Sequence, residues 1–318
     1  MSRQSFVASR RKAWDEFTGK VGKLSRTLGH LEPEEAASFP SEYRRMCQDL
    51  TLARHRRYGL AIAGRLNDLV LEGYHALHGH RRSPLLGAGR FLFVEFPREV
   101  RQYRGLLWLC ITLFFGPFLL LTLAGVVAPE WVYAAIGPEM RAQLDSSFGS
   151  GIDPRGANSD VQMFGFYVWN NVGIDFRTFA GGILYGIGTL FFLVFNGVVL
   201  GGAFGYALHA GHTEHFFAFT AGHGSLELTA VVISGMAGLK LAQGLVAPGR
   251  MRRGHALRVR AREGVRLIAG AAAMTVGAAF VEAFWSASAV PAGVKYVVGA
   301  CGWVAVILFF VFGGRRAS

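Results

Sequence analysis

The pattern of hydrophobic positions divides the chain into two parts. In residues 1–104 the apolar residues recur at helical spacing among polar ones, whereas several long apolar runs follow in the rest of the chain. A helix of about 20 apolar residues is long enough to cross the hydrocarbon core of a bilayer. The pattern therefore predicts an all-α protein in which a polytopic membrane helix bundle follows an N-terminal part outside the bilayer.

The N-terminal part is predicted to be a small helical bundle in the cytosol. Apolar residues recur every seven positions from Val7 onwards, which gives the first helix a seam of the coiled-coil kind, and Pro33 ends this helix. A second helix is expected after Pro40 and a third from about Tyr58. Three helices of this length would form a cytosolic helical domain at residues 1–87.

Residues 88–104 have a different pattern, in which bulky apolar residues alternate with Arg98, Arg101 and Arg104. This segment directly precedes the first long apolar run. We therefore expect an interfacial amphipathic elbow helix that lies along the lipid headgroups, with Pro97 at its bend. The alternative is an ordinary linker with a basic end.

Six apolar segments are expected to form the transmembrane helix bundle at residues 105–312. These segments are residues 105–128, 174–195, 197–210, 216–246, 264–285 and 293–312. The third segment is short, and it follows an expected break at Asn196 and Gly197. Five segments are the alternative, if residues 197–215 only enter the bilayer and return on the same side.

Basic and acidic residues predict the orientation of these segments. Lys and Arg are concentrated in residues 1–104, in the loop 248–262 and in the tail 313–318, and the positive-inside rule places all three in the cytoplasm. The outer loop 129–169 carries mainly acidic charges. They are Glu130, Glu139, Asp145, Asp153 and Asp160, against Arg141 and Arg155. An odd number of crossings must connect this loop to the basic loop, which is why three passes are expected between them.

The net charge of +12 on 318 residues bears on the expected partners. The basic residues lie next to the membrane segments, where each contributes about 1 kcal/mol of attraction to an anionic leaflet. Anionic lipid headgroups are therefore a more economical partner than nucleic acid, and no nucleic acid is expected to bind.

Glycines recur at four-residue spacing in the apolar segments. Gly197, Gly201 and Gly205 form one such repeat, and Gly182 with Gly186 forms another. Small residues at this spacing let helix backbones approach closely in lipid. The favoured interpretation is helix packing inside one bundle, and the alternative is the seam of a homodimer. We expect a homo-oligomer, with a dimer favoured.

Polar residues inside the apolar segments are the candidate functional site. His223 and Glu227 lie four residues apart near the middle of segment 216–246, so that their side chains share one helix face. A carboxylate at that depth is costly unless it is paired or protonated. The same set of polar residues includes Glu282, Asn196 and Ser225. They would form either a structural bond between helices or a hydrated cavity that relays protons, binds a headgroup or holds a metal.

A second polar cluster, "HAGHTEH", spaces His209, His212 and His215 three residues apart. Two imidazoles at this spacing can share one face of a helical end and bind a metal. However, zinc sites need three or four ligands and a supporting set of hydrogen bonds. A polar turn at the membrane surface is therefore the favoured interpretation, with pH-sensitive or headgroup contacts as a further alternative.

Several catalytic motifs are missing from the sequence. It contains no HExxH, no GxSxG, no Walker A loop and no CxxC pair. We therefore expect a protein that is not an enzyme and needs no cofactor. An intramembrane metal-dependent enzyme is the weakest of the alternatives.

Three stretches of the sequence resemble the stage II sporulation protein M family. They are "NNVGIDFRTFAGGILYGIGTLFFLVFNGVVLGG", "GHGSLELTAVVISGMAGLKLA" and "VEAFW". The residues that match the family pattern are Asn170, Asn171, Asn196, Gly197, His223, Gly224, Glu227, Glu282, Ala283 and Phe284. N-terminal features such as "FPREVRQYR" extend the resemblance over nearly the whole chain.

The resemblance implies a membrane component that anchors and localises peptidoglycan hydrolases without hydrolase activity of its own. The expected function is therefore a non-enzymatic integral membrane scaffold, with envelope or cell-wall remodelling proteins as partners. The alternative is a transporter or lipid-handling protein that uses His223, Glu227 and Glu282 in a wet cavity. Because the Arg-, Ala- and Gly-rich composition is typical of a GC-rich bacterium, we expect the bacterial cytoplasmic (inner) membrane, with both termini in the cytoplasm.

Overall fold

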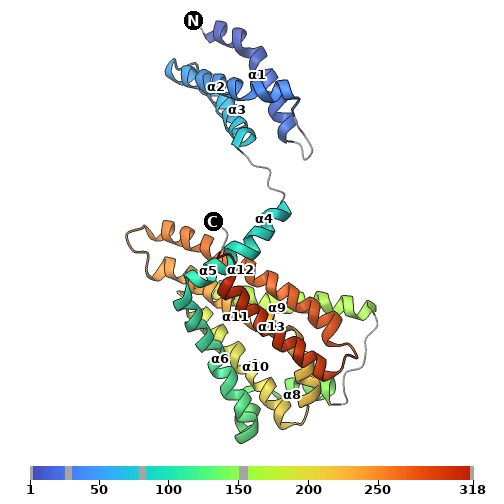
Figure 1. Ribbon diagram of the computed structural model, residues 1–318. Coiled ribbons are helices and arrows are strands. Elements are labelled where there is room, and N and C mark those ends of the chain that lie inside the picture. The colour runs from blue at the N-terminus through green and yellow to red at the C-terminus, as the bar shows by residue number, and fades with distance from the viewer. Residues whose placement is uncertain (1–2, 26–30, 79–83, 150–156, 316–318) are drawn as a thin grey trace. The chain divides into compact units, whose positions relative to one another are not determined.

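The chain is helical, as its hydrophobic pattern predicts. The computed structural model describes residues 3–25, 31–78, 84–149 and 157–315, and these ranges contain helices and no strand. The chain divides into two compact units, Met1–Pro84 and Leu85–Ser318, which we call the N-terminal unit and the membrane unit (Figure 1). Asp153, Arg155 and the tail residues 316–318 lie outside the described residues.

Three helices form the N-terminal unit. They are α1 (Arg3–Ser25), α2 (Pro33–His55) and α3 (Leu60–His78). The second helix begins at Pro33 and not after Pro40, because Glu32 and Glu35 form a capping box there and a proline is well suited to the first turn. Pro40 is accommodated inside the helix.

The N-terminal unit has a hydrophobic core of its own. The largest fully buried side chains of this core are Phe6, Trp14, Phe17, Met46 and Leu66. The indole nitrogen of Trp14 donates a hydrogen bond of 2.9 Å to the buried carboxylate of Asp49. The burial of these polar atoms is therefore compensated inside the unit.

The segment before the first long apolar helix consists of short helical pieces. They are α4 (Pro84–Arg90), the π-helical turn η1 (Phe91–Glu95) and α5 (Phe96–Gln102). Arg101 donates to the carbonyl oxygens of Phe310 and Gly313 at 2.7 and 2.6 Å, and Arg98 donates to that of Gly314 at 2.6 Å. The last carbonyl groups of a helix have no partner within it. These two arginines therefore cap the C-terminal end of the last helix of the chain.

Among the described residues of the membrane unit, five helices are long and apolar enough to cross a membrane. They are α6 (Arg104–Val127), α10 (Ile187–His209), α11 (Thr213–Val246), α12 (Arg253–Val281) with its π-helical end η3 (Glu282–Ser286), and α13 (Ala292–Phe312). The remaining elements are α7 (Pro129–Ala135), α8 (Pro138–Phe148), α9 (Ala157–Ala180) and the short 3-10 helix η2 (Gly181–Ile183).

The break between the second and third expected segments lies elsewhere. Helix α10 runs through Asn196 and Gly197 without interruption, and the Asn196 side chain donates to the carbonyl oxygen of Phe192 within the same helix, at 2.7 Å. The chain instead turns at residues 181–186, where Gly186 has a φ of 88° that glycine adopts without strain. Residues 174–195 and 197–210 are therefore divided between α9 and α10.

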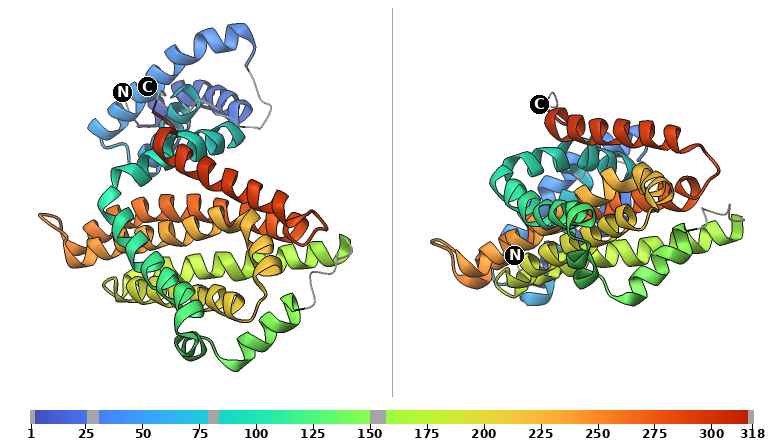
Figure 2. Two further views of the ribbon diagram at one scale, coloured as in Figure 1. Left: turned by 60° about the horizontal axis from the view of Figure 1, so that its bottom comes forward. Right: turned by 90° about the horizontal axis from the view of Figure 1, so that it is seen from below.

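Helix α9 belongs to the bundle although its composition is too polar for an obvious membrane span. It packs against α10, α11 and α12 (Figure 2). Its polar residues Asn171, Asp175 and Thr178 are buried, whereas Trp169 and Phe176 are exposed. Three polar residues of α9 thus point into the unit, whereas two of its large aromatic residues point outward.

The repeated glycines bring helices of one chain into contact. Gly197, Gly201 and Gly205 lie against the backbone of α6, where a side chain at any of the three would collide with a main-chain carbonyl group. Gly182 lies against the backbone of α11 in the same way, and Gly186 supplies the left-handed turn before α10. Close approach through small residues is the usual way in which membrane helices pack.

Candidate functional site

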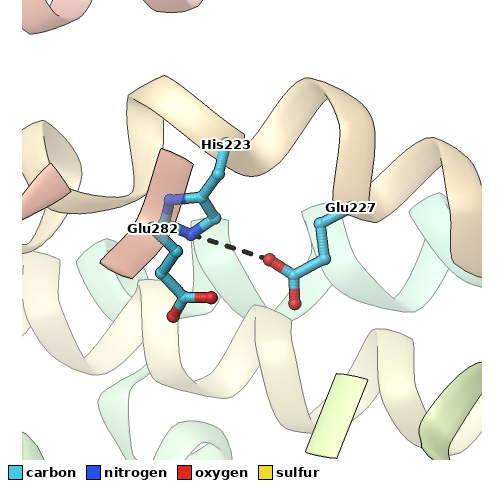
Figure 3. A group of neighbouring side chains, drawn as sticks. All are labelled: His223, Glu227 and Glu282. Atoms are coloured by element: carbon cyan, nitrogen blue, oxygen red, sulfur yellow. Dashed lines mark ion pairs between the residues drawn. The ribbon is translucent and has the colours of Figure 1, made fainter. Parts of the chain in front are cut away.

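His223, Glu227 and Glu282 come together inside the membrane unit. One ligand atom of each lies within 4.8 Å of those of the other two. The first two residues project from α11, and Glu282 opens the π-helical turn η3 (Figure 3). His223 is 4% exposed, Glu282 is 8% exposed, and the side chain of Glu227 is 20% exposed. We call these three residues the His/Glu/Glu cluster.

The imidazole of His223 has a different neighbour at each ring nitrogen. Its Nε2 lies 3.6 Å from Oε2 of Glu227, as the dashed line in Figure 3 marks. This separation is within reach of an ion pair but is longer than a hydrogen bond. Its Nδ1 lies 3.0 Å from the hydroxyl oxygen of Ser286. The ring is therefore held from η3, with Nε2 directed toward the carboxylates.

The carboxylate of Glu282 is held from α9. Asn171 donates a hydrogen bond of 3.3 Å to its Oε2, and Asn171 in turn accepts a bond of 2.8 Å from Asn170. The π-helical turn places both Glu282 and Ser286 beside His223, and π-bulges are frequent at functional sites. The chain around Ser286 is fixed by Lys295, which donates to its carbonyl oxygen at 2.7 Å.

A cavity of about 330 Å³ reaches the cluster. Its walls come from α10, from α11 and from α8, which is the longer helix of the predicted outer loop. The polar lining includes all three cluster residues together with Thr220, Gln143 and Ser147, and most of the remaining lining is apolar. An apolar cavity with a few convergent polar groups is typical of a small-ligand site.

A second buried polar centre was not predicted from the sequence. Asp175 of α9 is fully buried and accepts hydrogen bonds from Ser234 of α11 and Thr275 of α12. Asp175 lies four residues after Asn171 in "NNVGIDF", which puts both polar side chains on one helix face. This spacing was the sequence signal from which a buried polar face could have been predicted. Asp175 connects three helices and is not part of the His/Glu/Glu cluster.

Two of the candidate polar residues lie away from the cluster. The amide of Asn196 is bonded within α10, and Asn196 does not line the cavity. Ser225 is buried against α13, where a side chain added at Gly302 would meet its hydroxyl oxygen at 2.8 Å. The set His223, Glu227 and Glu282 is therefore brought together without Asn196 and Ser225.

The three histidines at the end of α10 and the start of α11 have separate partners. His212 lies 2.7 Å from a carboxylate oxygen of Asp145, His215 lies 3.2 Å from the carbonyl oxygen of Phe148, and the ring of His209 packs on Tyr133. Each thus contacts α7 or α8. Among the described residues, the group of three potential metal ligands is the His/Glu/Glu cluster and not these histidines.

The contact between His212 and α8 also sets the charge of Asp145. Hydrogen bonds from His212 and from Tyr206 hold the pKa of the Asp145 carboxyl below its ordinary value. The two oxygens of this carboxylate both accept from the Tyr206 hydroxyl at 3.0 Å. Asp145 therefore favours its ionised form and ties α8 to the end of the α10–α11 hairpin.

Two different family models match the chain, one over most of the membrane unit and one over most of the N-terminal unit. A family model described as Stage II sporulation protein M matches residues 107–287, and a model described as a domain of unknown function (DUF8413) matches residues 4–79. Neither the curated proteins nor the solved structures include a match to the chain. The first match spans more than half of the chain and contains the whole His/Glu/Glu cluster. The chain belongs to the stage II sporulation protein M family.

Proposed function

We propose that the protein is a non-enzymatic integral membrane scaffold that anchors or localises partner proteins in bacterial envelope or peptidoglycan remodelling. Its family membership supports this role, because the resemblance of its sequence to that family implies it. The observation that carries the proposal is that the N-terminal unit has a complete core of its own and still exposes a stripe of large apolar side chains.

The exposed stripe runs along α3. It consists of Leu60, Leu71, Tyr74 and Leu77, which we call the α3 stripe. At about 100° per residue, these positions fall within a sector of about 120° on the helix surface. Leu71, Tyr74 and Leu77 lie on adjacent turns, and Leu60 lies on the same side nearer the start of the helix. An exposed apolar patch on such a unit marks an interaction site. A helical partner segment with a complementary apolar face fits such a surface.

The proposal includes an orientation in which α9 is a sixth crossing. Its 24 residues are about 36 Å long, enough to span the hydrocarbon core. With α9 counted, the basic N-terminal unit, the basic segment 248–262 at the start of α12 and the C-terminus all lie in the cytoplasm, as the positive-inside rule favours. Helices α7 and α8 then lie outside, where they offer a second surface to envelope proteins.

In-cell photo-crosslinking tests the scaffold function. A photoreactive amino acid at position 71 of the full-length chain is expected to give one discrete crosslink to an envelope or cell-wall protein. Tyr74→Glu should abolish that crosslink, because a charge on the stripe opposes apolar docking. Glu72→Ala, on a neighbouring exposed position, should retain it. Crosslinks only to lipid or to the chain's own membrane unit would refute the proposal.

A second candidate function, a transporter or lipid-handling protein, is favoured by one observation. The cavity of about 330 Å³ has a largely apolar lining and reaches the three polar side chains of the cluster. In this case Glu227→Gln should leave folding intact and eliminate the cellular phenotype that the protein complements. Tyr74→Glu should leave that phenotype unchanged. The opposite result for the two variants would favour the scaffold.

A further inference from the structure

The spacing of the cluster atoms suits ligands of one ion better than partners in a hydrogen bond. Nε2 of His223 and Oε2 of Glu227 are 3.6 Å apart, beyond the 2.7–3.2 Å range of N–H···O bonds. Two ligands of a tetrahedral Zn²⁺, each about 2.1 Å from the metal, are about 3.4 Å apart. The Glu282 carboxylate completes a triangle whose sides are at most 4.8 Å. Side-chain rotations that move each of the three ligand atoms by less than about 1 Å would bring them to coordination distance.

Two of the three side chains are held from outside the triangle, as in known metal sites. A metal-binding histidine usually makes a hydrogen bond through its other ring nitrogen, and metal-binding carboxylates are similarly supported. Here Nδ1 of His223 lies 3.0 Å from the Ser286 hydroxyl, and Glu282 accepts from Asn171 at 3.3 Å. Nε2 of the imidazole is thus left facing the two carboxylates (Figure 3).

The charge of the cluster also points to a cation. Two carboxyl groups lie within 4.8 Å of each other in a largely buried position, where like charges repel and ionised groups lose hydration. Lys295 packs beside η3 but donates to the carbonyl oxygens of Ser286 and Ser288. A divalent cation would compensate both carboxylates at once. A proton shared by the two carboxylates is the competing explanation, and metal analysis separates the two.

We propose that His223, Glu227 and Glu282 bind one divalent transition-metal cation, with a coordination position open to the cavity. One imidazole and two carboxylates are donors that suit Zn²⁺, Mn²⁺ and Fe²⁺. Three protein ligands leave a further position, which a water molecule or an anionic group from the cavity would fill. This inference goes beyond the scaffold function and does not depend on it, since metal content and partner crosslinking are measured separately.

Metal analysis of the purified protein tests the site. The full-length chain, purified with a tag that contains no histidine and stripped with a chelator, is equilibrated with Zn²⁺, Mn²⁺ or Co²⁺. We expect about one metal per chain for at least one of these ions, and Co²⁺ absorption bands typical of a protein-bound ion. Less than about 0.1 metal per chain for all three ions would overturn the proposal and leave the shared proton.

Variants locate the bound metal. His223→Ala, Glu227→Gln and Glu282→Gln should each weaken binding at least tenfold, and Ser286→Ala should weaken it about tenfold by releasing the imidazole. Asp49→Asn, at the buried carboxylate of the N-terminal unit, should retain the wild-type affinity. Elution from a sizing column as one symmetric peak establishes that each variant is folded. If the metal is retained by all three cluster variants, it binds elsewhere and the proposal fails.

Discussion

Replacing Gly201 by alanine tests how closely α6 and α10 pack. A Cβ atom at this position would overlap the carbonyl oxygen of Phe118 and would lie 2.7 Å from its Cα atom. Ordinary contacts of a Cβ atom begin at 3.4 Å, so the two backbones must separate by roughly 0.7 Å or more. The atoms in the way belong to the main chain, and therefore no side-chain rotation relieves the collision.

The expected cost follows from this forced separation. Over-packing of a close interface destabilises a protein by about 1–3 kcal/mol. At about 2–4 °C per kcal/mol for a unit of this size, the midpoint of thermal unfolding should fall by about 2–12 °C. Gly116→Ala in α6 is the matched control, because a Cβ atom there meets nothing within 4 Å. Alanine also favours a helix over glycine, so the control should be neutral or slightly stabilising.

The cysteines of the chain provide the assay. Cys110 of α6 is buried, and its reaction with a thiol-reactive fluorophore on heating reports the opening of this helix. Cys47 and the exposed Cys301 are replaced by serine to remove background labelling. Equal midpoints for Gly201→Ala and Gly116→Ala would refute the packing argument. An unchanged midpoint with loss of a dimer, measured by light scattering, would instead identify the glycine repeat as an intermolecular seam.

Two further predictions concern the outer helices and the orientation. Hydrogen bonds from His212 and Tyr206 lower the pKa of Asp145. The contribution of Asp145 to the docking of α8 is therefore fully present above the pKa that it has in the unfolded chain, about 4. It is lost as the pH falls from there through the lower folded-state pKa. The protection factors of the α8 amides, which correct for the slower intrinsic exchange in acid, should therefore fall as the pH drops below about 4. Asp145→Asn should lower these protection factors at neutral pH, and high salt should reduce the effect, since Asp145 is exposed. Wild-type protection factors that stay constant from neutral pH into acid would contradict this. In a cysteine-free chain, a cysteine at Thr213 should be labelled from outside intact cells and one at Gly254 only after permeabilisation. The reverse pattern would mean that α9 does not cross the membrane.

The proximity of the two cluster residues on α11 was predictable, because helical periodicity relates residues that are close in sequence. A spacing of four residues puts His223 and Glu227 on one helix face in any α-helix. The position of Glu282 is a different case. It depends on the packing of α12 against α11 and on the π-helical turn η3, which shifts the side chains at the end of α12. Neither the packing of these helices nor the π-helical turn can be inferred from the local sequence pattern.

Helix α9 shows why hydropathy alone gave the wrong segment boundaries. Averaging along a segment adds together all faces of a helix, and the buried residues Asn171, Asp175 and Thr178 lower the average although lipid does not meet them. The position of the break was misjudged for a related reason. Asn196 bonds within its own helix and does not interrupt it, whereas the left-handed conformation of Gly186 ends the preceding segment.

The sequence by itself determined the helical class, the presence of several long apolar helices beyond residue 104, the family and the shared face of His223 and Glu227. The family follows from the motifs that match its pattern. The other properties follow from composition and from a periodicity of 3.6 residues, both of which act over a few turns of chain. Only the tertiary structure decided that Glu282 joins this pair, that α8 lines a cavity beside them and that Asp175 connects three helices. Such contacts depend on which helix faces meet, and that is decided by close packing between segments far apart in the chain.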